Sequence, residues 1–197
     1  MEERNELYPV FLKVNKLNIL IIGGGNVGLE KLHFLLKSSP NANVEVLAKG
    51  FLPETLELAE KHGVKVTKRR YRSKYLKKRH VVIAATNDTK LNKKIYRHAK
   101  KRYLLANIAD TPDLCDFYMG GIVNKGYVKI AISTNGKSPT TAKRLREFFE
   151  EVIPENINQM VENLNEYRKS IKGDFEDKVN QMNTITEALK VKNERND

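Results

Sequence analysis

The chain contains 197 residues, 40% of them hydrophobic, and has a formal net charge of +12 at pH 7. A chain of this length can bury one core, or one domain with a small appendage, and its composition excludes disorder throughout. No apolar stretch approaches the roughly 18 to 20 residues of a membrane helix, and no signal-peptide core follows the N-terminus, so we expect a cytoplasmic protein without membrane contact. The one cysteine, Cys115, excludes an internal disulfide framework, and we interpret it as a small buried side chain rather than a catalytic thiol.

The positive charge is concentrated in one segment. Residues 61–102 contain 17 Lys or Arg residues and one acid, Asp88, whereas 12 acids and 7 bases follow from Glu147 onward. A basic segment attracts phosphate or polycarboxylate ligands and would also hold nucleic acid loosely, but it is equally consistent with a solvated face. Few aromatic residues interleave these charges, so no base-stacking platform is indicated and we expect no specific nucleic-acid partner.

An apolar strand over residues 18–22 leads into a Gly-x-Gly-x-x-Gly turn formed by Gly23, Gly25 and Gly28. The residues that follow have the apolar spacing of a helix. Gly23 permits the tight turn, Gly25 lets the backbone approach a phosphate, and Gly28 lets the helix pack closely on the strand. We interpret the turn as a dinucleotide site at the positive end of the helix dipole, with a merely structural glycine-rich turn as the alternative.

Strands and helices then alternate as far as residue 108. We predict strands over residues 43–48, 64–67, 80–86 and 104–108. We predict helices over residues 51–62, with Leu52, Leu56 and Ala59 on one side, and around the stripe Leu91, Ile95 and Ala99. This alternation predicts an α/β fold with a parallel, doubly wound sheet, in which ligands lie along the carboxyl ends of the strands. The predicted cofactor rim comprises residues 23–28, Ala48, Lys49, Thr86, Asn87 and residues 107–110, which include Asn107 and Asp110.

Two positions on this rim need separate interpretation. The acid that usually holds the ribose 2′-hydroxyl is missing, and Lys49 stands near its place. Lys49 favours a 2′-phosphate, but a backbone contact to the ribose is equally consistent, so position alone does not choose between NAD and NADP. Asp110 follows the last predicted strand, where a nicotinamide ring is expected, although Asp-Thr-Pro is also an ordinary turn opener.

The pattern changes after Asp110. A long loop leads into a predicted β-hairpin, with strands over residues 122–123 and 127–133 and a turn over residues 124–126. Ser138 and Pro139 open a predicted helix that extends through Phe149. From Pro154 onward we expect wholly helical chain with Ile157, Val161 and Leu164 on one stripe, ending in a frayed charged tail over residues 193–197.

Six motifs in this order resemble the siroheme synthase family. They are YPVFL at residues 8–12, GGGNV at 23–27, AATND at 84–88, NIADTP at 107–112, CDF at 115–117 and STNGKSP at 133–139. The resemblance covers about residues 8–150 and concerns the precorrin-2 dehydrogenase part of that family. It implies an N-terminal Rossmann-like NAD-binding domain over residues 1–112, a small β-hairpin dimerisation region over 113–150 and a helical C-terminal region over 151–197.

The resemblance also implies an activity. The family oxidises precorrin-2, a tetrapyrrole with eight carboxylates, to sirohydrochlorin in siroheme biosynthesis, with NAD as hydride acceptor, and its members are homodimers. The family's catalytic aspartate falls on Asp110, and its cofactor contacts fall on Asn26, Val27, Ala48 and Lys49, which favours NAD over NADP. A positioned carboxylate here would accept a proton from the macrocycle, or orient it.

Some family members also insert Fe²⁺ into sirohydrochlorin. The histidines His33, His62, His80 and His98 lack metal-ligand spacing, so the sequence predicts no metal site and leaves iron insertion open. The alternative function is a module that senses NAD(H) without chemistry, which would need no acid beside the nicotinamide. A nucleic-acid-binding protein that uses residues 61–102 is the remaining alternative.

Overall fold

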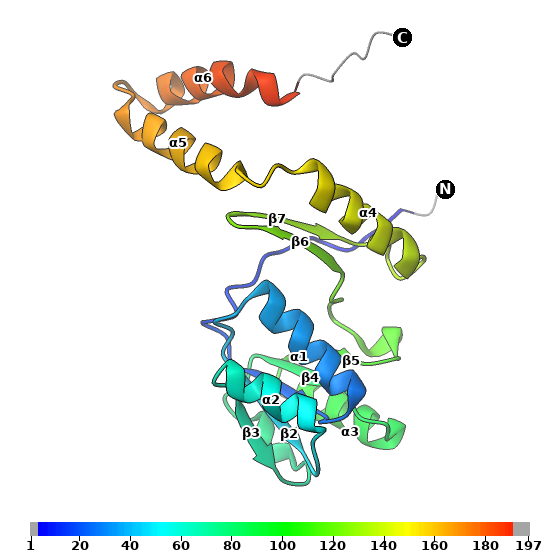
Figure 1. Cartoon of the computed structure of the whole chain (residues 1–197). Coiled ribbons are helices and arrows are strands. Elements are labelled where there is room, and N and C mark those ends of the chain that lie inside the picture. Colours follow the sequence, from blue (N-terminus) through cyan, green and yellow to red (C-terminus); the bar gives the residue numbers. More distant parts are fainter. Residues whose placement is uncertain (1–3, 191–197) are drawn as a thin grey trace. The chain divides into compact units, whose positions relative to one another are not determined.

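The computed structural model describes residues 4–190. The chain divides into two compact units, Met1–Gly120 and Gly121–Asp197, each of which is described by itself. Figure 1 labels the elements of both. No helix in the described range is long and apolar enough to cross a membrane.

The first unit contains a five-stranded parallel sheet of order β3-β2-β1-β4-β5. The strands are β1 Ile19–Ile22, β2 Val44–Ala48, β3 Lys65–Lys68, β4 Val81–Ala84 and β5 Leu105–Ile108. The helices are α1 Asn26–Ser38, α2 Pro53–Lys61 and α3 Thr89–Lys100, with short 3₁₀ turns η1 Ser73–Leu76 and η2 Pro112–Leu114. The predicted alternation of strands and helices and the parallel sheet are confirmed.

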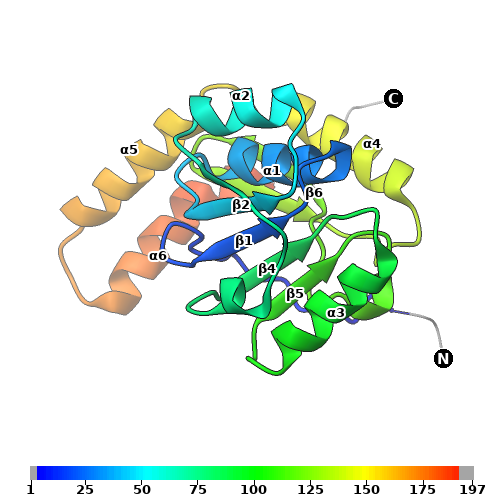
Figure 2. The ribbon, with the colours of Figure 1, turned by 90° about the horizontal axis from the view of Figure 1, so that it is seen from below.

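Helices cover both faces of this sheet. Leu32 and Leu36 of α1 and Ala59 of α2 pack with Ile19 and Ile21 on one face. Figure 2 shows α3 on the other face. Its residues Ile95 and Ala99 pack there with Leu20 and Val82. Because neither face meets water, every residue of β1 and β4 is buried, which explains the uninterrupted apolar runs in the sequence.

The prediction for α2 is wrong at one position. Leu56 is 43% exposed, and the core-facing side chains are Thr55 and Ala59. The helix begins at Pro53, and from that start the i, i+4 pair Thr55 and Ala59 points to the core. The buried Thr55 hydroxyl donates a hydrogen bond to the carbonyl oxygen of Gly24 (3.2 Å), so a polar residue occupies the place that the apolar pattern assigned to Leu56.

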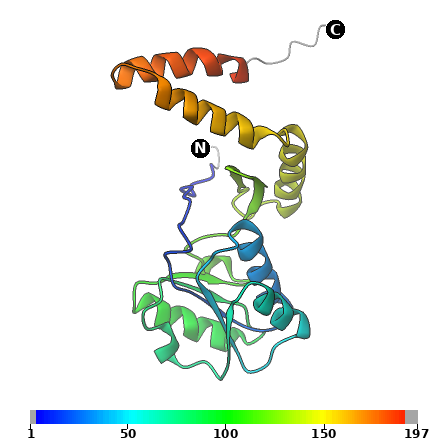
Figure 3. The ribbon, with the colours of Figure 1, turned by 60° about the vertical axis from the view of Figure 1, so that its left-hand side comes forward.

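The second unit begins with the predicted β-hairpin. Strands β6 Gly121–Lys125 and β7 Val128–Ile132 pair antiparallel, and α4 Pro139–Val152 packs against β6, as Figure 3 shows. The predicted turn position is wrong, because Asn124 and Lys125 belong to the ladder and the turn is Gly126 and Tyr127. Gly126 has φ 57°, the conformation that two-residue hairpin turns require.

The helical C-terminal segment is interrupted. Helix α5 spans Ile157–Ser170, α6 spans Phe175–Thr186, and the 3₁₀ turn η3 spans Glu187–Lys190. The expectation of continuous helix is wrong at residues 171–174, where Gly173 has φ 126° and Asp174 caps α6 by accepting from the Asp177 amide (2.9 Å). The expected frayed tail, residues 193–197, lies outside the described residues.

Candidate nucleotide and catalytic site

The glycine turn between β1 and α1 is built by backbone packing. A Cβ atom at Gly23 would collide with the carbonyl oxygen of Ala85, and one at Gly28 would collide with that of Gly23. Gly23 also has φ 135°, which L side chains rarely adopt. These two glycines are therefore required by the close approach of β1, β4 and α1.

Gly25 differs from both, because nothing lies within 4 Å of a Cβ placed there. It is the N-cap of α1 and supplies no side-chain cap, and the first turn of the helix contains no acid. The amides of Asn26, Val27 and Gly28 therefore have no intrahelical partner and form, with the helix dipole, a suitable place for an anionic group. This open, uncapped helix end fits the pyrophosphate of a dinucleotide.

The carboxyl end of β2 carries Ala48 and Lys49. The Ala48 carbonyl oxygen accepts a hydrogen bond from the Arg69 amide (2.8 Å), and the Lys49 side chain is exposed. The Ala48 carbonyl oxygen is therefore engaged by the segment after β3, and this end of the rim offers the Lys49 cation to a ribose.

In the turn after β4, polar side chains form hydrogen bonds with one another and with the start of α3. The Thr86 hydroxyl donates to Asn92 Oδ1 (2.6 Å), and Asn92 Nδ2 donates to the Thr86 carbonyl oxygen (2.9 Å). Asp88 caps α3 by accepting from the Leu91 amide (2.9 Å), and Asn87 is left exposed. Thr86 therefore shapes this turn through its side chain, while Asn87 is free to face a ligand.

Asn92 was not predicted to have a role, although it is buried. The signal was present, because Asn92, Ile95 and Ala99 follow helical i, i+3, i+7 spacing, and a polar residue on an apolar stripe requires a buried hydrogen-bond partner.

Asp110 lies two residues beyond the end of β5, in the left-handed region with φ 58°. Its side chain is exposed, and none of residues 4–190 is hydrogen bonded to its carboxylate. Non-glycine residues rarely adopt this conformation, although Asp tolerates it better than most, and such residues cluster at functional sites. The carboxylate is therefore held on a defined backbone and is available to a ligand.

The loop that follows is tied back to β5 by three side chains. Asn107 Nδ2 donates to the Phe117 carbonyl oxygen (2.8 Å). Asp116 accepts from the Ala106 amide (2.9 Å) and pairs with Lys100 Nζ (2.8 Å). Cys115 Sγ contacts the amide and carbonyl of Ile108, both at 3.3 Å. We predicted Asn107 on the cofactor rim, but its side-chain amide nitrogen is used to hold the loop at Phe117.

These contacts also give Cys115 a role. Its side chain is half-buried, and burial raises the pKa of the thiol, with the nearby Asp116 charge acting in the same direction. A raised pKa keeps the sulfur protonated and poorly nucleophilic. This supports a structural role for Cys115, although it is less buried than we predicted.

The basic segment contains one packed aromatic pair, Tyr71 and His98, with ring centroids 6.0 Å apart and a 3.0 Å hydrogen bond between them. Burial raises the pKa of Tyr71 to about 12. Burial, and then the positive charges of Lys94 and Arg102, lower the pKa of His98. Within residues 4–190 no three His, Cys, Asp or Glu side chains gather so as to hold a metal ion.

The predicted rim residues stand at one edge of the sheet. They follow or end the parallel strands β1, β2, β4 and β5, whose carboxyl ends share that edge. They are Gly23, Gly25, Asn26, Val27 and Gly28 after β1, Ala48 and Lys49 at β2, Thr86 and Asn87 after β4, and Asn107 and Asp110 at β5.

Comparison with known families adds to this geometry. Residues 10–121 match a family described as "Putative NAD(P)-binding", which is more than half of the chain. The chain belongs to this NAD(P)-binding family. Residues 125–151 match the family described as "Sirohaem biosynthesis protein central". Together the two matches confirm the resemblance to the siroheme synthase family and support a nicotinamide dinucleotide as the cofactor.

Siroheme synthases are among the relatives of this family member. That of Baumannia cicadellinicola subsp. Homalodisca coagulata is 34% identical over 167 residues, which are 85% of this chain and 36% of the relative. That of Zymomonas mobilis subsp. mobilis is 33% identical over 164 residues, covering 83% of this chain and 34% of the relative. The chain thus spans about a third of the length of these curated relatives.

Among solved structures, "SirC, precorrin-2 dehydrogenase" is similar over 91% of this chain and 89% of its own, with a TM-score of 0.75 and 24% identity. This similarity confirms the predicted fold, including the hairpin and the helices that follow the sheet.

Proposed function

We propose that this protein oxidises precorrin-2 to sirohydrochlorin, with NAD as the hydride acceptor. The observation that carries the proposal is the position of Asp110. Its backbone is in the left-handed conformation, its carboxylate is exposed, and it lies at the same sheet edge as the open turn around Gly25. The siroheme synthase relatives and the name of the SirC structure supply the substrate class.

The chain's own residues would hold the cofactor along that edge. Gly23, Gly25, Asn26, Val27 and Gly28 take the pyrophosphate through backbone amides. Ala48 and Lys49 lie at the ribose, while Thr86, Asn87 and Asn107 line the remainder of the rim. NAD, when bound, supplies the acceptor for the hydride that leaves the substrate.

The oxidation removes a hydride and a proton from the macrocycle. Asp110 accepts that proton as a general base, or orients the ring from which it leaves. The loop anchored by Cys115 and Asp116 fixes the backbone on both sides of Asp110, which keeps the carboxylate at a constant place. The basic segment of residues 61–102 attracts a substrate with several carboxylates.

We also propose that the protein is a homodimer through the second unit, with residues 1–112, 113–150 and 151–197 as cofactor, dimerisation and helical regions. Leu145, Phe148 and Val152 of α4 are 39%, 54% and 54% exposed and follow i, i+3, i+7 spacing. An exposed apolar stripe of this kind is typical of an interaction surface. The proposal covers the oxidation step and not iron insertion.

The test is an anaerobic absorbance assay with precorrin-2 and either NAD or NADP. We expect the sirohydrochlorin spectrum and reduced cofactor to appear together, faster with NAD than with NADP. Tight NAD binding without any change of the tetrapyrrole spectrum would instead support the NAD(H)-sensing module. Salt-sensitive retention of DNA with no response to NAD would support a nucleic-acid-binding protein.

A further inference from the structure

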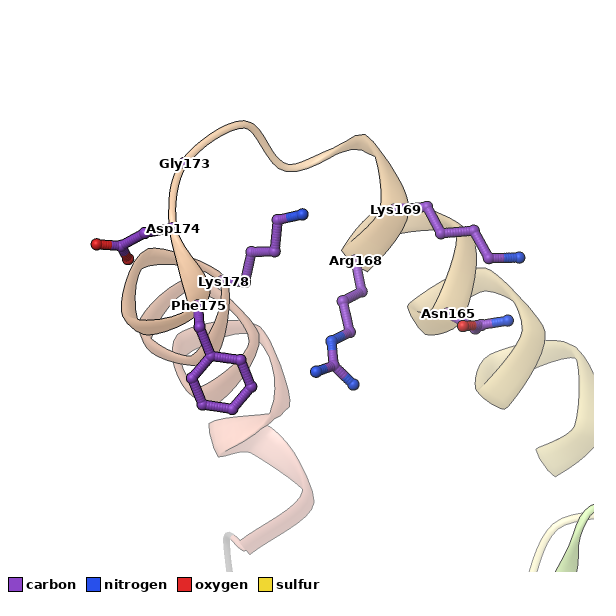
Figure 4. Close-up of a pocket in the computed structure, with 7 residues that line it drawn as sticks. All are labelled: Asn165, Arg168, Lys169, Gly173, Asp174, Phe175 and Lys178. Carbon is purple, nitrogen blue, oxygen red and sulfur yellow. The ribbon is translucent and has the colours of Figure 1, made fainter.

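The second unit contains a cavity of about 510 Å³ between α5 and α6, separate from the residues assigned above. Figure 4 shows its lining. Arg168 from α5 and Lys178 from α6 extend into the space between the helices, and the Phe175 ring lies across from the Arg168 guanidinium. Lys169 also lines the cavity, but its side chain points away from the gap between the helices. The gap therefore presents two cations and one aromatic face.

The two cations have no acidic partner in the described part of the chain. Asp174 also lines the cavity, but its carboxylate points away from the gap and caps α6. Two cations without an acidic partner, facing one gap, are suited to an anionic ligand.

Helix stability explains only part of this arrangement. Arg168 lies in the last turn of α5, where a cation interacts favourably with the helix dipole. Lys178 is the fourth residue of α6, near the positive end of that helix, where a cation is disfavoured. Phe175 is 71% exposed. The helix dipole therefore does not explain why a cation stands at position 178, and it has no bearing on the exposure of the Phe175 ring.

We propose that this pocket binds one carboxylate-bearing ring of the tetrapyrrole. Arg168 and Lys178 pair with carboxylates, and Phe175 stacks on the flat ring. Charge-assisted hydrogen bonds supply the affinity, and an aromatic face suits a conjugated ligand. The inference rests on the proposed function for the identity of the ligand, but it assigns binding to residues outside the oxidation site.

The experiment titrates the full-length protein with uroporphyrin, a stable octacarboxylate porphyrin, and follows its fluorescence. We expect R168Q/K178Q to raise the Kd about tenfold and F175A to raise it severalfold. The matched control is K172Q, which removes one charge from the exposed turn without touching the cavity. It should leave the Kd within about a factor of two, as expected for an exposed charge.

NAD affinity and far-ultraviolet circular dichroism check that each variant is folded. If R168Q/K178Q does not fold, K178Q alone replaces it.

The outcomes separate this inference from the proposed function. Equal Kd values for wild type, K178Q, R168Q/K178Q and K172Q would overturn the pocket, even if wild type oxidises precorrin-2. A selective loss of porphyrin affinity in the pocket variants, with no oxidation by wild type, would support the pocket and contradict the proposed activity.

Discussion

Among single residues, Asp110 combines two features. Its backbone is in the left-handed region, and its carboxylate is exposed rather than used to cap a turn. The motif match selected this residue among the acids of its loop, but sequence alone does not give its conformation. The loop after Asp110 is held by anchors such as Asp116, which accepts from the Ala106 amide of β5, and these contacts are not visible in the sequence.

We predict that Asp110→Ala lowers kcat by about 10²-fold or more, because a positioned general base typically contributes 10²- to 10⁴-fold. The Kd for NAD should remain unchanged, because the proposed pyrophosphate site is formed by backbone amides of the turn after β1, to which Asp110 contributes no group. The matched control is Asp113→Ala, an exposed acid of the same loop, which should keep wild-type turnover. Undiminished turnover in D110A would remove Asp110 from the mechanism.

The glycines of the turn should respond differently to alanine. Gly28→Ala places a methyl group against the backbone of Gly23, so we expect a stability loss of about 1 to 3 kcal/mol. Gly25→Ala meets open space at φ −90° and should cost less stability than Gly28→Ala, because alanine is only a poorer N-cap residue there, while weakening NAD binding about tenfold. Thermal melts and NAD titrations of both variants check this, and NAD affinity unaffected by G25A would place the pyrophosphate elsewhere.

Among the secondary-structure elements, strand β2, which lies beside the edge strand β3, contains a buried carboxylate. Glu45 of β2 is 6% exposed, accepts from the Thr67 hydroxyl (2.6 Å) and pairs with Arg79. Burial alone would raise the pKa of Glu45, but the hydrogen bonds from Thr67 and Arg79 and the charges of Arg79 and Lys65 outweigh it and lower the pKa below 4.5. This carboxylate fastens β3 and the segment after η1 to β2.

The lowered pKa gives a signed prediction for stability. The folded state binds this proton less readily than the unfolded state, so the stabilisation is complete above pH 4.5 and is lost as the pH falls through the folded-state pKa. Glu45→Gln should lower the free energy of unfolding by about 1 to 3 kcal/mol at pH 7. It should also weaken the dependence of that free energy on pH below pH 4.5. Urea unfolding from pH 7 to pH 3 measures both, with Glu57→Gln on the exposed face of α2 as control. Identical profiles for E45Q and wild type would contradict this role.

The sequence predicts an element well where all its residues are buried. It predicts poorly which side chains face the core where polar contacts determine the orientation. The apolar runs of β1 and β4 and the stripe of α3 predicted those elements within a few residues, because both faces of the sheet are covered. Leu56 was misjudged because Thr55 takes the core-facing place in α2, where its hydroxyl donates a hydrogen bond to the carbonyl oxygen of Gly24, 31 residues away in the sequence. Asn92 was missed although its partner Thr86 is only six residues away, because a polar residue on an apolar stripe was not interpreted as a buried hydrogen-bonding group. The break between α5 and α6 was visible in Gly173 and Asp174 but lacks the proline that usually marks one.

For the assembled protein, we propose a homodimer formed through α4. We expect sedimentation to give twice the 22.6 kDa mass of the chain. Phe148→Glu places a charge on the exposed stripe and should shift the protein to monomer. Phe34→Glu is the matched control, because Phe34 of α1 is 49% exposed and Phe148 is 54% exposed. A wild-type protein that sediments as a monomer, or an F148E variant that remains dimeric, would contradict the proposed surface.

The stoichiometry of the reaction with oxygen excluded tests whether the protein is an NAD-dependent precorrin-2 dehydrogenase. The protein is mixed with precorrin-2 and NAD, and sirohydrochlorin and NADH are quantified in the same sample by their absorbance. We predict one molecule of NADH for each molecule of sirohydrochlorin, and no sirohydrochlorin when NAD is omitted. Sirohydrochlorin that forms at the same rate without NAD, or NAD that is bound but never reduced, would contradict the account.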